Sequence, residues 1–399
     1  MPGKILERLL NGRLQRYAEE NQLYKPNQYG FRANRGTQQA IAVAYETIGQ
    51  ELAKGMTVRV VLRDVKSAFD KVWHTGLKVK LLRGGLPPRF LSAITTFLDD
   101  RTATVRVQGH ITEPFPLRAG VPQGAILSPA LYNLYVADMP QSVRGRNIVF
   151  ADDVSQIVSG YRNRIQQYVE EEIHRTSLYE RKWKIRTCPN KFKIVAINRP
   201  KLRLSYRVDP TDPTKIAEEE TQGRFLGLQL RATGLHHSAV ERAKIVHAKL
   251  GALQRFKNLS SQKKRTLYMA QIRSYMLYPC VPWEAVGSRQ QASLQTVQNH
   301  AANFIGGYDW RERTTARRKG EDQKLEPISA TLKRHAEKVW HRLQQLDDDL
   351  FQKLRDDSNR LRRRFKRLWP SSLHSLEKDR PDYYTQKEAL EQRRAGTNH

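Results

Sequence analysis

The sequence predicts an α+β fold in which an antiparallel sheet is followed by a helical region, and three observations predict it. Residues 57–63 are rich in β-branched side chains and lead directly into Asp64, which is typical of a buried strand that ends in a carboxylate. Alternating patterns on both sides of Gly109, and again around Ala151, predict two hairpins. From about Val240 onward the apolar spacing is helical.

The other elements follow from the same spacing rules. A break at Lys25-Pro26-Asn27 separates two helices within residues 1–52. Further helices are predicted at about 75–83, 88–99, 126–139 and 162–182. Strands are predicted at 102–107, 112–117, 147–150, 154–158, 193–197 and 225–230.

Composition narrows the class of partner. The 399 residues correspond to roughly two or three domains of about 150 residues each. Lys and Arg number 70 against 40 Asp and Glu, a net charge of +30, so we expect a polyanionic partner: nucleic acid first and an acidic membrane surface second. Two cysteines exclude a disulfide framework and a Cys-rich zinc site, which favours an intracellular compartment. The apolar stretches are too short for a membrane span or a signal peptide.

Three acids stand out at predicted strand ends. Asp64 follows one apolar strand, and Asp152 and Asp153 occupy a hairpin turn about ninety residues later. Mg²⁺ is usually held by one or two carboxylates together with substrate phosphates. If the two strand ends are neighbours in one sheet, Asp64 and Asp152 could hold a pair of ions for in-line phosphoryl displacement. An Asp-Asp turn alone would be weak evidence, since solvated turns often contain such pairs.

Motifs around these acids occur in one order along the chain. Asp64-Val-Lys-Ser-Ala-Phe-Asp70 comes first, Gly120-Val-Pro-Gln-Gly124 second and Phe150-Ala-Asp-Asp153 third, between the flanking segments Gln28–Arg32 and Trp183–Lys191. From residue 4 to about 310 the chain resembles the reverse transcriptase of a non-LTR retrotransposon, most closely of the jockey type. The resemblance implies a right-hand polymerase with fingers and an antiparallel palm sheet at residues 1–235, a helical thumb at 236–310 and a basic helical tail at 311–399.

The resemblance also implies a metal site. Asp64, Asp152 and Asp153 match the family's metal-binding acids: the first two are expected to ligate two Mg²⁺ ions, with Mn²⁺ as an alternative, and the third to support them. The backbone carbonyl of Val65 is expected to add an oxygen ligand.

Four further residues match substrate-binding positions of the family. Phe69 matches the residue that crowds the sugar 2′ position and so favours dNTPs over ribonucleotides. Gln123 is expected to contact the nucleotide and the templating base, and Arg32 the triphosphate, because a guanidinium suits bidentate phosphate contact. Lys191 matches a lysine that protonates the departing pyrophosphate. Structural alternatives stay open for all four.

Arg63 departs from the family, which has an apolar residue before the first acid. Strand alternation turns its side chain to the face opposite Asp64. There we expect it either to bind nucleic acid or to reach solvent.

The C-terminal tail has two interpretations. Its basic runs and interleaved aromatic residues, among them Phe351, Phe365 and Trp369, would hold single-stranded template by charge and stacking. The alternative is a solvated amphipathic helix whose aromatic residues contact a core. Residence in the nucleus is implied by the resemblance.

Three functions stay open at this point. The first is RNA-templated DNA synthesis with an RNA template, a DNA primer and dNTP substrates. Because the family's proteins carry an endonuclease and further fingers sequence upstream, we expect this chain to be N-terminally truncated, so the second is a catalytically idle nucleic-acid-binding protein. The third, an RNA-templated RNA polymerase, is disfavoured by Phe69.

Overall fold

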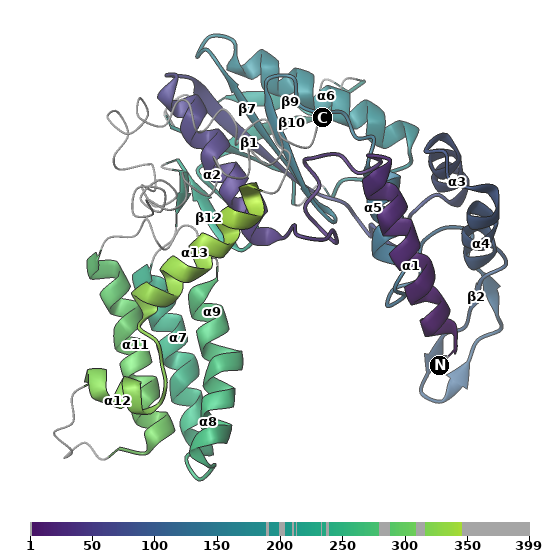
Figure 1. Ribbon diagram of the computed structural model, residues 1–399. Helices are drawn as coiled ribbons and strands as arrows, with labels where there is room; N and C mark the ends of the chain where they lie inside the picture. The colour runs from purple at the N-terminus through teal and green to yellow at the C-terminus, as the bar shows by residue number, and fades with distance from the viewer. Residues whose placement is uncertain are drawn as a thin grey trace, which may run out of the picture. The chain divides into compact units, whose positions relative to one another are not determined.

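The strand predicted at residues 57–63 lies inside a six-stranded sheet (Figure 1). The order is β6-β7-β1-β8-β10-β9, and all pairings are antiparallel except that of β8 with β10. The strands are β1 (Thr57–Asp64), β6 (Gly145–Phe150), β7 (Asp153–Gly160), β8 (Lys193–Ile197), β9 (Ser205–Arg207) and β10 (Ile216–Glu220). The antiparallel sheet predicted from the hairpins is therefore confirmed in β6, β7 and β1.

The structure is a computed structural model, and it describes residues 2–188, 191–198, 204–209, 211–212, 214–232, 234–236, 239–278, 288–308 and 316–344. The chain divides after Gly234 into two units. The sequence predicts a boundary after residue 235, and the assignment of fingers, palm, thumb and tail to stretches of the chain stays a prediction.

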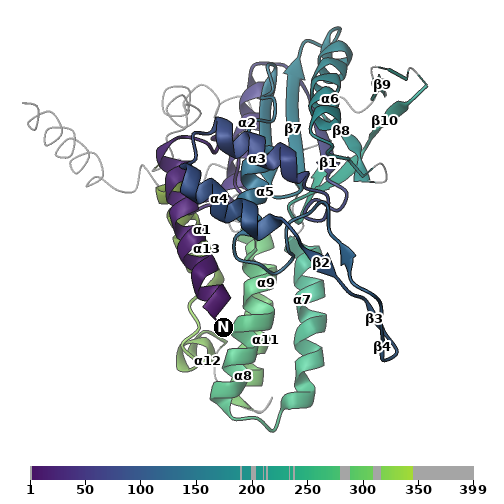
Figure 2. The same cartoon turned by 90° about the vertical axis from the view of Figure 1, so that its right-hand side faces the viewer.

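The first unit has helices α1 (Pro2–Glu20), α2 (Thr37–Ala53), α3 (His74–Arg83), α4 (Pro88–Leu98), α5 (Ser128–Val136) and α6 (Ile165–Lys182). Of these, α2 and α6 cover the two faces of the sheet. Gln156 of β7 donates to Thr176 of α6 (3.0 Å), whereas Ser159 of β7 donates to Glu51 of α2 (2.7 Å). Residues 156 and 159 point to opposite faces of a strand, so α6 and α2 lie on opposite sides of the sheet (Figure 2).

A hydrophobic core lies among α1, α3, α4 and α5. Leu14, Leu77, Ile94 and Leu131 are fully buried there. These helices begin and end close to the predicted positions, although α5 is shorter than the predicted 126–139. The hairpin predicted around Gly109 is also present, as two short ladders: β2 (Thr102–Ala103) with β5 (Phe115–Pro116), and β3 (Arg106–Val107) with β4 (His110–Ile111).

Two parts of the sheet structure differ from the sequence predictions. The strand predicted at 225–230 is a hairpin of β11 (Gln222–Phe225) and β12 (Leu228–Arg231), because Leu226 and Gly227 both adopt positive φ and turn the chain. Together with β13 (Gly234–His236) these strands form a separate three-stranded sheet. Strands β9 and β10 were not predicted at all.

A buried ion pair explains why β10 belongs to the sheet despite three consecutive glutamates. Glu219 of β10 lies 2.5 Å from Nε of Arg59 on β1, and both side chains are almost completely buried. The Tyr206 hydroxyl of β9 donates to the same carboxylate oxygen at 2.5 Å. This triad ties β1 to β9 and β10, which lie far from it in the sequence.

From Ala239 onward the second unit is helical in all its described stretches, as the spacing after Val240 predicts. Its elements are α7 (Ala239–Leu253), η3 (Gln254–Phe256), α8 (Ser261–Leu267), the π-helical η4 (Tyr268–Arg273), α9 (Ser274–Leu277), α11 (Ser288–Gly306), α12 (Ala316–Asp322) and α13 (Ile328–Gln344). The predicted tail residues Phe351, Phe365 and Trp369 lie outside the described residues. No helix among those described is long and apolar enough to span a bilayer.

Replacing Glu219 with Gln should destabilise the protein strongly, because Arg59 would keep a buried charge without its counterion. Loss of one partner of a buried pair costs about 3–5 kcal/mol. Urea unfolding of the whole chain measures this, with Glu218→Gln on the same strand as the control, since Glu218 is exposed. An equal loss in both variants would contradict the role of the pair.

Glu46 of α2 predicts a specific pH dependence of stability. Its side chain is buried, one carboxylate oxygen has no partner, and burial raises its pKa to about 8. The folded state therefore holds this proton more tightly than the unfolded state. The stability it contributes is complete below the ordinary carboxyl pKa and is lost as the pH rises toward 8, by up to about 1.4 kcal/mol per pH unit.

Glu46→Gln should remove that slope. The variant is expected to match the wild type near pH 4.5 and to exceed it in free energy of unfolding at pH 8, measured by urea unfolding at both values. A difference between variant and wild type that does not change with pH would show that Glu46 is ionised in the folded protein.

Candidate active site

The three predicted acids lie at one end of the β1–β7 pair. Asp64 is directly opposite Asp153 in the antiparallel register, and opposite residues of such a pair point to the same face. Asp152 precedes Asp153 in the turn between β6 and β7, and its carbonyl accepts a hydrogen bond from the backbone N–H of Val65 (3.1 Å). The strand ends that carry the acids are therefore neighbours, as the two-ion hypothesis requires.

In this cluster three carboxyl groups lie near one another, and Lys191 supplies the opposing positive charge. The pKa of Asp153 is raised to about 6: burial is the main cause, the neighbouring Asp152 and Asp64 carboxylates add to it, and Lys191 opposes it. Nζ of Lys191 lies 2.9 Å from Oδ1 of Asp64, and this contact raises the pKa of the lysine. The ammonium is exposed, so it neutralises Asp64 while staying accessible to a substrate.

A cavity of about 210 Å³ opens beside the acids on the same face of the sheet. Asp64, Asp153 and Lys191 line it together with Arg224 and Phe225 from β11, and other lining residues come from β1, β6, β7 and β8. The structure thus brings three of the predicted residues to one cavity. Five other predicted residues are not among its lining residues: Arg32, Val65, Phe69, Gln123 and Asp152.

The acids fit a hard divalent cation by their chemistry. Carboxylate oxygens are the ligands that Mg²⁺ prefers, and three carboxyl groups lie together here beside Lys191. Within the described ranges, no group of three or more His, Cys, Asp or Glu side chains is placed so that it could hold a metal ion by itself. Mg²⁺ usually completes its ligand shell with substrate phosphates and water, so a cluster of this kind suits an ion that arrives with a nucleotide.

Backbone contacts from an earlier segment hold the turn that carries Asp152 and Asp153. The N–H of Tyr29 donates to the Val149 carbonyl (2.8 Å), and the N–H of Val149 donates to the Asn27 carbonyl (2.9 Å). Gly30 follows, and a Cβ atom there would lie 2.6 Å from the backbone nitrogen of Ala151. Glycine is therefore the residue that allows this approach. Sequence reasoning named the segment but not this role.

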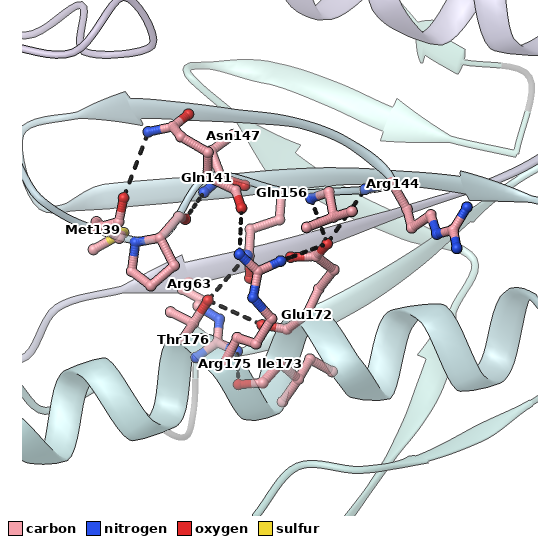
Figure 3. Close-up of polar contacts among 12 residues, drawn as sticks. Arg63, Met139, Gln141, Arg144, Asn147, Gln156, Glu172, Ile173, Arg175 and Thr176 are labelled. Atoms are coloured by element: carbon pink, nitrogen blue, oxygen red, sulfur yellow. Dashed lines mark hydrogen bonds and ion pairs between the residues drawn. The ribbon is translucent and has the colours of Figure 1, made fainter.

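The opposite face of the hairpin is held by a polar network from α6 (Figure 3). Oε1 of Glu172 accepts hydrogen bonds from the backbone N–H groups of Val143 (2.7 Å) and Arg144 (3.4 Å). Arg175 donates to Glu172 (3.3 Å) and to the Gln141 carbonyl (2.8 Å). The chain that enters β6 is thereby fixed to α6.

Arg63 is also part of the contact with α6, which corrects one expectation. Alternation placed its side chain on the face opposite Asp64, and this is confirmed. The expectation that it binds nucleic acid or reaches solvent is wrong: its side chain is 2% exposed and pairs with Glu180 of α6 (3.2 Å). It also donates to the Ile173 carbonyl and lies over the Phe192 ring.

Gln123 lies in a loop packed against the turn after β1. Its Nε2 donates to Oδ1 of Asp70 (2.8 Å). Gly120 has a φ of 91°, and a Cβ atom there would lie 2.7 Å from the Asp70 carbonyl oxygen. The backbone of the loop Gly120–Gly124 therefore packs directly against the backbone at Asp70. Nζ of Lys4 in α1 donates to the Gly124 carbonyl (2.9 Å) and supports the loop from outside.

Phe69 and Arg32 occupy different surroundings. The Phe69 ring is half-buried and stacks on Tyr132 of α5, with ring centroids 5.2 Å apart. The Arg32 guanidinium is 5% exposed and is bound by Glu19 through two contacts of 2.9 and 2.5 Å. It also lies over the Tyr24 ring. Binding of a triphosphate by Arg32 would require release from Glu19, and that role stays a prediction.

Comparisons with known proteins agree with this arrangement. Residues 1–230 match the family model described as reverse transcriptase (RNA-dependent DNA polymerase). The chain is 29% identical over 389 residues to the probable RNA-directed DNA polymerase from transposon X-element of Drosophila melanogaster, covering 93% of this chain and 41% of that protein. It is 26% identical over 410 residues to the RNA-directed DNA polymerase from mobile element jockey of the same species, covering 94% and 42%.

Among solved structures, apo telomerase from Candida tropicalis covers 86% of this chain and 55% of its own, with 11% identity and a TM-score of 0.44. The chain spans about two fifths of the length of the two curated relatives. The family model covers more than half of the chain, and the jockey-type resemblance read from the motifs is confirmed. This chain belongs to the reverse transcriptase family.

Proposed function

We propose that this chain is an RNA-directed DNA polymerase of a non-LTR retrotransposon, which adds deoxynucleotides to a primer 3′-hydroxyl on an RNA template. The observation that supports it most is the register of β1 with β7: Asp64 faces Asp153, and Asp152 lies in the adjoining turn. In a chain of the reverse transcriptase family, this is the arrangement that two-ion phosphoryl transfer needs. The net charge of +30 suits a nucleic-acid substrate.

Mg²⁺ is the proposed cofactor, with Mn²⁺ as an alternative. Asp64 and Asp152 would hold two ions, Asp153 would support them, and the Val65 carbonyl would add an oxygen. When bound, such ions lower the pKa of the primer hydroxyl and neutralise charge on the triphosphate.

The chain's own residues would then position the reactants. Lys191 is kept protonated by Asp64, which raises its pKa, so it has a proton to give to the departing pyrophosphate. Gln123 is held by Asp70 at the loop where the nucleotide and the templating base would lie. Phe69 would leave no room for a 2′-hydroxyl. Catalysis of this kind depends mainly on positioning and charge stabilisation.

Asp152→Asn should abolish primer extension while leaving nucleic-acid binding intact. Loss of one ion ligand is expected to lower the extension rate at least about 1,000-fold, equivalent to roughly 4 kcal/mol of transition-state stabilisation. The assay extends oligo(dT) on poly(rA) with dTTP and Mg²⁺, next to filter binding of the same template and primer.

Asp99→Asn is the matched control, because Asp99 is exposed and pairs only with Lys78 among the contacts described. Equal extension by Asp152→Asn and the wild type would refute the proposed function. Binding by the wild type without Mg²⁺-dependent extension would favour the idle nucleic-acid-binding protein instead.

Phe69→Val should relax the choice of sugar. Removing the ring opens space for a 2′-hydroxyl, so the ratio of kcat/KM for dTTP over that for UTP should fall on the order of 10- to 100-fold. Steady-state extension on poly(rA) measures both substrates. A wild-type preference for UTP that Phe69→Val leaves unchanged would point to an RNA-templated RNA polymerase.

A further inference from the structure

The Phe69 ring contacts two other aromatic rings, those of Phe31 and Tyr132, and we call these three residues the aromatic ladder. Phe69 stacks on Tyr132 with centroids 5.2 Å apart and an angle of 23° between the rings. Phe31 meets Phe69 edge-on, with centroids 6.4 Å apart and an angle of 90°. Both arrangements are favourable aromatic geometries.

The two outer rings differ in how firmly they are held. Tyr132 is 1% exposed within α5, whereas Phe31 is 48% exposed. Phe69 therefore contacts one ring that is held in the core and one ring that faces solvent. Burial of apolar area explains Tyr132, but it explains Phe31 poorly, because an exposed ring gains little from the hydrophobic effect.

The backbone of Phe31 is also unusual. Its φ is 54°, a left-handed conformation that a bulky residue with a Cβ atom adopts at a cost. Such conformations persist where the surroundings determine them, and they are frequent at functional sites. An exposed aromatic residue held in this conformation needs a reason other than packing.

The contacts that hold the Phe31 backbone in this conformation come from the turn that carries Asp152 and Asp153 and from α5. Gly30, the residue before Phe31, packs against the backbone of Ala151 so closely that a Cβ atom would not fit. The Gly30 carbonyl accepts a hydrogen bond from Nδ2 of Asn133 in α5 (2.7 Å). The same peptide therefore contacts the turn that carries the acids and the helix that carries Tyr132, so the Phe31 ring is placed relative to both.

We infer that Phe31 is a positioning residue that holds the Phe69 ring in place and thereby sets the discrimination between deoxyribonucleotides and ribonucleotides. This inference rests on the proposed function, in which Phe69 crowds the sugar 2′ position. Without the edge contact from Phe31, the Phe69 ring is free to tilt away from Tyr132 on its open side. Space for a 2′-hydroxyl then appears although Phe69 itself is unchanged.

Phe31→Gly is the decisive variant, because glycine adopts a φ of 54° without strain while the ring is removed. In the full chain, the ratio of kcat/KM for dTTP over that for UTP on poly(rA) and oligo(dT) should fall about 2- to 10-fold, as expected for the loss of one aromatic pair. Phe31→Tyr, which keeps the ring, should retain the wild-type ratio. Phe115→Gly in β5 is the control, since Phe115 is 43% exposed and lies outside the ladder.

A double variant shows whether Phe31 acts through Phe69. In the Phe69→Val background, Phe31→Gly should change the ratio no further, because the ring that it positions is already gone. The same additional loss in both backgrounds would overturn the inference. So would a wild-type ratio in Phe31→Gly together with a lowered ratio in Phe69→Val. Thermal melting of each variant confirms that the compared chains are folded.

Absence of extension by the wild-type chain would contradict the proposed function and not this inference. The inference is then decided by equilibrium binding of dTTP and UTP to the chain with template and primer. A lower dTTP preference in Phe31→Gly than in the wild type supports it, and equal preferences overturn it.

Discussion

Three carboxylates gathered at one strand end repel one another, and much of the first unit opposes that repulsion. Burial raises the pKa of Asp153, and the Asp152 and Asp64 carboxylates raise it further. Lys191 offsets part of it, but the position of the acids is maintained by backbone contacts on one side of the hairpin and by the α6 network on the other. A loosely held turn would relax by moving its charges apart, and the site would lose the charge density that gives it an affinity for cations.

Local patterns predicted the elements that carry the acids because those elements are encoded locally. The β-branched run of β1 and the alternation around Ala151 are visible within ten residues, and the antiparallel register of β1 with β7 follows once both strands exist. The motif order then identified the acids correctly as neighbours. Roles for Arg32, Phe69, Gln123 and Lys191 came from resemblance, and the geometry leaves them as predictions.

What the sequence did not reveal depends on partners far along the chain. Ile216–Glu220 has the polar composition of an exposed segment, and it becomes a strand because Glu219 meets Arg59, 160 residues away. Arg63 is a charged residue next to the acids, and only the presence of Glu180 on α6, 117 residues later, makes its burial possible. Composition and spacing carry no information about such pairings, so they become visible only in three dimensions.

Gly30 packs against the turn that bears Asp152 and Asp153, so this contact forms only after both segments have been synthesised. Gly30 leaves the ribosome 121 residues before Ala151 (151 − 30), which at about 5–20 residues per second is roughly 6–24 s earlier. Throughout that interval the segment has none of the backbone against which it finally packs. The hairpin that bears Asp152 and Asp153 thus packs against a segment that is synthesised well before it.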